Sequence, residues 1–325
     1  MLRQCAPIRP WPAWLLALAL AGACTESGTL SPPPAPPPTG RLYFTVREPP
    51  TNSRPYSVFR PHGTEVLAGQ PERIPEPYDA TGSAAISPDG RTLAFEESSH
   101  IVAYDLKTGQ TRDVTNGRWP DRDPAWSPDG RLLLVRREPF LGQPRKLVLL
   151  NADGSGERDL FAFANDAAAI FGMGWSADGQ WIYLVVTADP EPAPKTIVYR
   201  VAVNAQVPGL VKVTEGPIRS WHEHRVTGQI AVLLLNATFD SIQVAVYRSA
   251  TQRYTKVGSF SVAESRSLEL ATWSPDGRYL AVLWSSQVSH WLLLFDVDGR
   301  RLYSQRRIDA GPEDFGFSWG PWPIP

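Results

Sequence analysis

A short turn motif recurs four times along the chain in nearly the same letters. It occupies residues 87–91, 127–131, 176–180 and 274–278, and reads Ser-Pro-Asp-Gly-Arg, except that the third copy reads Ser-Ala-Asp-Gly-Gln. Proline pre-sets φ for a turn, and glycine supplies a position with positive φ. A unit that recurs every roughly 40–50 residues is the signature of a repeat architecture.

The copy at residues 127–131 shows the repeating unit most clearly. A short strand is predicted at 124–127, and apolar strands follow the turn at 131–136 and 146–151. A fourth, edge-like strand begins at 157–160. Four short antiparallel strands in each repeat are typical of a β-propeller blade.

The same division gives further blades, which start near residues 84, 173 and 271. Their later strands are predicted at 92–96, 101–105 and 111–115, at 181–186 and 196–203, and at 279–283, 291–296 and 302–307. A fourth, degenerate blade has Ser220-Trp221-His222-Glu223-His224 in place of the motif, with strands predicted at 229–235 and 243–248. The tryptophans directly before three of the turns, Trp126, Trp175 and Trp273, are predicted to be wedges between blades.

The two ends of the chain complement each other. Residues 41–47, 56–60 and 64–68 offer three strands without an inner one, and residues 316–319 offer an inner strand alone. Joined, they make a sixth blade that closes the ring and removes its exposed edges. The fold class is therefore an all-β, six-bladed propeller over residues 41–325.

The N-terminus is predicted to be an export signal. Arg3 and Arg9 precede an apolar run at 14–23, which is shorter than the about 20 residues of a comfortable membrane span, so residues 1–23 fit a signal peptide. The proline-rich residues 24–40 favour polyproline II and are interpreted as a stiff tether.

The Cys24 region resembles the bacterial lipobox, in which the first mature residue is a lipidated cysteine. It departs from that motif because Ala21 stands where leucine is preferred, so cleavage without lipidation is the alternative. With Thr25 after the cysteine, the resemblance implies an outer-membrane lipoprotein facing the periplasm, or a secreted or periplasmic protein if Cys24 is not lipidated.

The run Asp123-Pro124-Ala125-Trp126-Ser127-Pro128-Asp129-Gly130-Arg131 is similar to the WD-like propeller repeat of the TolB family. TolB proteins are periplasmic, six-bladed and non-catalytic, and they bind protein partners, so the resemblance implies a binding platform. Two features depart from TolB, because a tether stands where TolB has an N-terminal α/β domain, and Cys24 predicts an anchored protein. The same repeat also builds the propeller of prolyl oligopeptidase-like enzymes, so it predicts fold better than function.

Composition and motifs exclude several function classes. The formal net charge of -1 over 325 residues gives no sign of non-specific nucleic-acid binding. Both cysteines, Cys5 and Cys24, lie before the predicted propeller, which therefore has no disulfide or thiolate metal site. The sequence contains no Gly-x-Ser-x-Gly nucleophile elbow, phosphate loop or His-Glu-x-x-His, and we expect no catalytic residues and no cofactor.

Two possible ion sites have structural explanations as well. His222 and His224 are two residues apart on a strand and share a face, so both imidazoles could meet one metal, but no third ligand is visible. A degenerate turn explains them without a metal. Calcium needs about six to eight oxygens, whereas the Asp-Gly hairpins offer two or three, and turn chemistry explains those residues.

The variable loops at the end of the ring opposite the turns are the predicted binding surface. Aromatic and arginine side chains are the usual anchors of protein interfaces. The predicted rim residues are Tyr78, Arg118, Trp119, Arg122, Arg219, Arg266, Glu313 and Asp314.

Three functions remain open from the sequence. The first is a non-enzymatic, monomeric envelope lipoprotein that binds an envelope protein or peptide, with the membrane reached through a lipid anchor. The second is a periplasmic lyase or hydrolase that uses the channel, which would need acids and a histidine on the inner strands. The third is a small-ligand sensor.

Overall fold

Each of the four turn motifs closes a hairpin between the first two strands of a blade, as the sequence predicts. Around Ser127, the serine hydroxyl donates to Asp129 and accepts the Leu132 N–H at 2.9 Å. The Gly130 N–H donates to the Ser127 carbonyl at 2.9 Å, and Gly130 has a φ of 71°. Glycine adopts that region without a steric penalty, so side chains and backbone specify the same turn.

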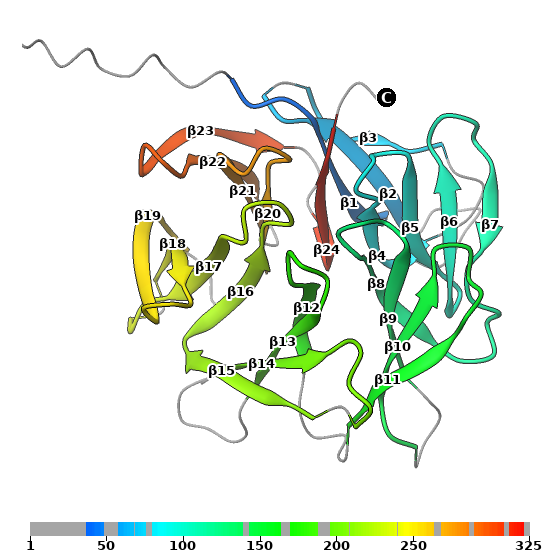
Figure 1. Ribbon diagram of the computed structural model, residues 1–325. Coiled ribbons are helices and arrows are strands. Elements are labelled where there is room, and N and C mark those ends of the chain that lie inside the picture. The colour runs from blue at the N-terminus through cyan, green and yellow to red at the C-terminus, as the bar shows by residue number, and fades with distance from the viewer. Residues whose placement is uncertain are drawn as a thin grey trace, which may run out of the picture. The chain divides into compact units, whose positions relative to one another are not determined.

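The computed structural model in Figure 1 describes residues 37–48, 58–67, 69–75, 80–138, 143–163, 170–187, 196–207, 209–238, 240–262, 268–285, 289–308 and 312–321. The chain from residue 38 onward forms one compact unit. The predicted signal peptide, Cys24 and the tether up to residue 36 lie outside the described residues and stay predictions. Within the described ranges, no helix is long and apolar enough to cross a membrane.

Five blades are continuous in sequence, and each has four antiparallel strands; blades 2 to 5 are separate sheets, and blade 1 is joined to the sixth blade by the pairing of Phe59 with Ala80. In chain order their strands are β4 (Ala80–Ile86), β5 (Thr92–Glu97), β6 (His100–Asp105) and β7 (Thr111–Asp113) in blade 1; β8 (Asp121–Trp126), β9 (Leu132–Arg137), β10 (Lys146–Asn151) and β11 (Arg158–Ala162) in blade 2; β12 (Ile170–Trp175), β13 (Trp181–Thr187), β14 (Thr196–Ala202) and β15 (Val211–Gly216) in blade 3; β16 (Ile218–Glu223), β17 (Ile230–Leu235), β18 (Ser241–Arg248) and β19 (Arg253–Ser261) in blade 4; β20 (Leu268–Trp273), β21 (Tyr279–Ser285), β22 (His290–Asp296) and β23 (Arg301–Ile308) in blade 5.

The sixth blade joins the two ends of the propeller, which confirms the predicted closure. Its inner strand β24 (Pro312–Gly320) pairs with β1 (Arg41–Glu48), and Leu42 lies opposite Trp319. Figure 1 shows β24 in red beside β1 in blue. The inner strands contact one another in the order β24, β4, β8, β12, β16, β20 and back to β24, so the ring of six blades is closed.

The outer half of the sixth blade differs from the prediction. The strands predicted at 56–60 and 64–68 are one strand, β2 (Val58–Glu65), and the fourth strand is β3 (Glu72–Arg73). The Pro-His-Gly sequence at 61–63 reads as a turn, but Pro61 pairs with Thr45 inside the sheet. The Arg41 side chain lies where a Cβ of Gly63 would stand, so this glycine admits a close neighbour instead of making a turn.

Two ends of the ring carry different chain segments. We call the end with the Ser-Pro-Asp-Gly turns the turn rim, and the opposite end, where the chain runs into each inner strand, the loop rim. Four residues predicted in loops of the loop rim lie on inner strands instead: Arg122 on β8, Arg219 on β16, and Glu313 and Asp314 on β24. The prediction missed them because strand pairing extends beyond the apolar segments, as in the pair of Arg122 with Arg136.

The apolar core lies between neighbouring blades. One cluster joins Leu233 and Val244 of blade 4 to Val282 and Phe295 of blade 5, all fully buried. The tryptophans before the turns are wedges between blades, as predicted. Their indole N–H groups donate to the inner strand of the preceding blade, from Trp126 to Ala85 at 3.1 Å, from Trp175 to Ala125 at 3.0 Å and from Trp273 to His222 at 2.9 Å.

Candidate binding sites

The predicted rim residues Arg118, Trp119 and Arg122 lie together at the start of blade 2. The Arg118 guanidinium stacks over the Trp119 ring at 5.6 Å from its centroid. Both arginines are exposed and Trp119 is half-buried. An arginine over an indole face is a favourable cation–π contact. The loop rim therefore presents an aromatic ring under one arginine, and a second arginine, Arg122, that pairs with Glu96 at 3.7 Å.

Backbone hydrogen bonds hold this segment of the loop rim in place. The Arg118 N–H donates to Asn116 Oδ1 at 3.0 Å, and the Glu138 N–H donates to the Pro120 carbonyl at 2.8 Å. Behind the segment, the fully buried Asp121 carboxylate accepts the Arg137 Nε–H at 2.7 Å. The exposed side chains thus stand on a fixed backbone.

Asp123 is a strained residue directly beneath this surface. Its φ of 51° lies in the left-handed region, where a non-glycine residue costs about 1–3 kcal/mol. Three contacts hold it: the Ser83 hydroxyl donates to its carboxylate at 2.9 Å, Arg136 Nε donates at 2.6 Å, and its own N–H donates to Glu96 at 2.7 Å. The pairing of β8 with β9 shifts register here, between Arg122 and Ala125. Such bulges re-aim side chains at functional surfaces.

The other predicted rim residues do not extend this cluster in the described structure. Arg219 is exposed on β16 in blade 4, which is separated from blade 2 by blade 3. Tyr78 and Arg266 lie outside the described residues. Glu313 and Asp314 lie on β24, and the structure describes their backbone alone.

A cavity of about 260 Å³ occupies the channel at the turn rim, away from the predicted protein-binding surface, and its lining includes His222 and His224. All six inner strands contribute to its walls. The described lining comprises residues 84–88, 124–128, 173–175, 222–225, 272–275 and 317–319. The wedge residues Trp126, Trp175 and Trp273 therefore have a second role, because they also wall the cavity, together with Trp319 of β24.

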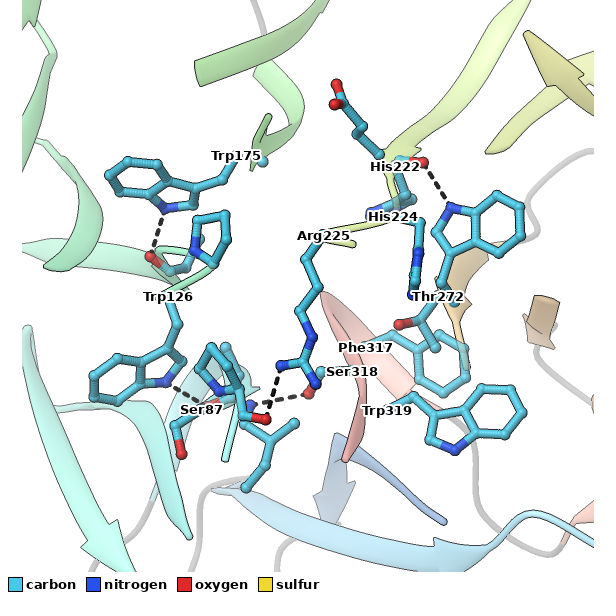
Figure 2. A pocket seen from close by; sticks show the side chains of 18 of the residues that line it. Ser87, Trp126, Trp175, His222, His224, Arg225, Thr272, Phe317, Ser318 and Trp319 are labelled. Atoms are coloured by element: carbon cyan, nitrogen blue, oxygen red, sulfur yellow. Dashed lines mark hydrogen bonds between the residues drawn. The ribbon is translucent and has the colours of Figure 1, made fainter. Parts of the chain in front are cut away.

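Arg225 spans this cavity. Its Nη1 donates to the Pro88 carbonyl at 2.7 Å, and Figure 2 shows the side chain reaching across the channel. Arg225 follows β16 and Pro88 follows β4, and these strands are opposite each other in the ring. Burial lowers the pKa of Arg225, which the nearby Asp89 partly offsets. No described carboxylate forms an ion pair with Arg225.

Glu223 occupies the place of the wedge tryptophan in blade 4. Its carboxylate accepts the Ala177 N–H at 2.9 Å. The other three motifs have proline at the position of Ala177, which has no N–H to give. Burial raises the pKa of Glu223, while this hydrogen bond and one to Tyr183 oppose the rise. The two residues that differ from the repeat, Glu223 and Ala177, therefore hydrogen-bond to each other.

The two histidines of the fourth blade are unlike each other. His224 takes the place of the motif serine: its Nδ1 accepts the Thr227 N–H at 3.1 Å, and its Nε2 faces the Pro275 carbonyl at 3.3 Å. Burial lowers the pKa of His224. His222 is surrounded by protein on all sides but the cavity, and this burial lowers its pKa to about 4. Among the described residues, no group of three His, Cys, Asp or Glu side chains could hold a metal ion. A metal at His222 and His224 stays a prediction.

Sequence reasoning missed Arg225, although a signal for it was present. In the register of the structure, His224 aligns with the motif serine, so Arg225 stands where the other blades have Pro88, Pro128 and Pro275. The degenerate motif of blade 4 therefore supplies both Arg225 and Glu223 to the cavity lining.

Comparisons with known proteins agree on the fold. No protein-family model matches the sequence. A curated relative, the uncharacterized peptidase YuxL of Bacillus subtilis strain 168, is 31% identical over 113 residues. That match covers 31% of this chain and 16% of the relative, so the chain aligns with a small part of that protein.

Solved structures match over most of the propeller. The crystal structure of TolB from Acinetobacter baumannii has a TM-score of 0.63 at 18% identity, covering 87% of this chain and 67% of that one. A structure of oligogalacturonate lyase in complex with manganese has a TM-score of 0.52 at 14% identity, covering 74% and 73%. Identities this low establish the fold alone. By fold, the chain is a TolB-like, six-bladed β-propeller.

Proposed function

We propose that this chain is a non-enzymatic scaffold of the bacterial cell envelope that binds a protein or peptide through its loop rim. The observation that carries the proposal is the surface of Arg118, Trp119 and Arg122. Tryptophan and arginine are the residues that most often dominate binding energy at interfaces. Here the two arginines are exposed and Trp119 is half-buried, on a backbone held by hydrogen bonds next to the strained Asp123. A surface ordered before binding loses less entropy when a partner docks.

The chemistry of the channel supports binding over catalysis. General acid–base catalysis needs a proton-transfer group directed at the substrate. Among the described residues that line the cavity, Glu223 supplies the carboxylate, and it accepts a backbone N–H from the neighbouring blade. Both ring nitrogens of His224 have protein partners, and His222, which is open to the cavity, is a weak base because burial lowers its pKa to about 4. An enzyme that uses the channel is the alternative, because one of the structurally similar proteins is a lyase.

The envelope location rests on the N-terminal sequence and on the TolB-like repeats. In this proposal Cys24 carries the lipid, and residues 24–40 hold the propeller away from the outer membrane on its periplasmic side. Growth with radiolabelled palmitate tests the anchor: the wild-type protein should take up label, and Cys24→Ala should not. Unlabelled wild-type protein would contradict lipidation and leave a secreted or periplasmic form.

The binding surface is tested by capture of partners from detergent-solubilised envelopes. We expect a protein retained by the wild type to be lost from the double variant Trp119→Ala/Arg122→Ala. Arg131→Ala is the matched control, because its side chain is 85% exposed on the turn rim, at the other end of the ring. The retained protein is then purified and titrated against each variant.

The outcome is judged on affinity. Loss of two central anchors typically weakens an interface by about 2 kcal/mol or more, which is about thirtyfold in Kd. Equal affinity of all three proteins for the captured partner would place its binding site elsewhere and refute this surface.

A further inference from the structure

The cavity at the turn rim combines aromatic walls with a cation. Its described lining includes Phe317, Trp319 and the wedge tryptophans, and Arg225 projects through it. Ligand sites generally have this composition, with apolar walls and a few polar groups that fix orientation. The cavity therefore has the make-up of a binding site, at the end of the ring away from the proposed protein-binding surface.

Arg225 keeps most of its hydrogen-bonding capacity within this cavity. A guanidinium has five N–H donors in a planar fork, and the described partner of Arg225 is the Pro88 carbonyl. That carbonyl carries no formal charge. A fork of this shape matches a carboxylate, which accepts two parallel N–H bonds.

The acid nearest in sequence does not neutralise Arg225. Glu223 hydrogen-bonds to Ala177 and to Tyr183 of blade 3, which commits its carboxylate to the neighbouring blade. Asp89 lies near enough to offset part of the effect of burial on the pKa of Arg225, but forms no ion pair with it in the described structure. A half-buried cation without an ion-pair partner is costly in a protein, unless a ligand supplies the anion. Three of the other motifs have proline at the position of Arg225, so the turn itself does not require an arginine there.

We propose that this cavity binds a terminal carboxylate, with the Arg225 guanidinium as its anchoring group and the tryptophan rings as its walls. The volume of about 260 Å³ lies just below the range of about 300–1,000 Å³ that is usual for drug-sized ligands. It fits a small organic acid or the last residue of a peptide chain. The site is independent of the proposed loop-rim function, which uses other residues.

Calorimetric titration of the full-length protein at low salt tests this site. The probe is N-acetylphenylalanine, and the matched probe is N-acetylphenylalanine amide, which has the same shape without the charge. We expect the acid to bind at least about tenfold more tightly, because hydrogen bonds between charged groups are about twice as strong as neutral ones. An alanine hexapeptide ending in phenylalanine, with a free or an amidated C-terminus, then distinguishes a peptide end from a small acid.

Two pairs of variants assign the binding to this cavity. Arg225→Gln should abolish the preference for the acid, while Arg131→Gln, on the same rim but outside the lining, should keep it. Gly174→Leu should block the cavity, since a Cβ at Gly174 would meet no atom within 4 Å and can point into it. Gly172→Leu is its control, because Gly172 lies on the same strand, has equal space and does not line the cavity.

The results separate the possibilities. Acid-selective binding that both Arg225→Gln and Gly174→Leu remove supports the site, with the hexapeptide deciding its natural source. If Arg225→Gln does not fold, Gly174→Leu against Gly172→Leu decides. Equal binding of acid and amide, no binding of either, or binding unchanged in Gly174→Leu would overturn the proposal without touching the loop-rim function.

Discussion

Protonation of His222 should destabilise the propeller as the pH falls below its ordinary pKa. Burial lowers the pKa of this ring from 6.5 to about 4 in the folded chain. The unfolded chain therefore binds a proton first, and acid favours unfolding between these two values. Well above pH 6.5 the ring is neutral in both states, and it contributes no pH dependence.

The size of the effect follows from linkage. With pKa values of 6.5 unfolded and about 4 folded, the loss of unfolding free energy from pH 7 to pH 5 is about 2 kcal/mol. His222→Gln removes the titrating ring. It keeps the backbone carbonyl that accepts the Trp273 indole N–H. The variant should therefore lose about 2 kcal/mol less stability over the same interval than the wild type.

Urea unfolding followed by tryptophan fluorescence at pH 7, 6 and 5 measures this difference. His100→Gln is the matched control, because it removes one histidine from β6 in blade 1, outside the cavity lining. The control keeps His222, so it should still lose the about 2 kcal/mol that this ring causes. Equal losses in the wild type and His222→Gln, within about 0.5 kcal/mol, would refute the assigned cause.

Three further predictions concern stability and are checked by the same unfolding assay. Trp273→Phe should cost about 1 kcal/mol more than Trp221→Phe, because the Trp273 indole donates a hydrogen bond and the buried Trp221 N–H has no partner; equal costs would argue against the wedge bond. Ala177→Pro should destabilise by about 1–3 kcal/mol although it restores the repeat, because it removes the N–H that Glu223 accepts; a neutral result would show that this bond is dispensable. Gly82→Ala should destabilise by about 1–3 kcal/mol, since the added methyl overlaps a buried carboxylate, and an unchanged midpoint would contradict that crowding.

The architecture was predictable because local chemistry repeats along the chain. Serine, aspartate and glycine of each turn bond to one another within five residues, so the sequence alone specifies the hairpin. Blade spacing then follows from counting turns. The closure by β1 and β24 was predictable too, since each end lacked the strands that the other had.

The outer strands and the sites depend on contacts that are distant in sequence. β2 is one strand because Pro61 and Gly63 pair with β1, and a Pro-His-Gly sequence alone favours a turn. Arg118 and Trp119 were identified from residue type, but the left-handed Asp123 beneath them is set by Ser83, forty residues away. The Arg225 bond to Pro88 joins residues 137 apart.

Departures from the repeat carry more functional information here than the repeat itself. Positions that keep the motif are explained by turn geometry and by packing between blades, which every blade requires equally. Glu223 and Ala177 depart together, because a carboxylate in the tryptophan slot needs an N–H that proline cannot give. Arg225 replaces the proline of the motif although the turn does not require an arginine, and its side chain projects into the channel. The Glu223 departure is satisfied by the neighbouring blade, whereas Arg225 leaves a charge facing the cavity, and the proposed carboxylate site rests on that difference.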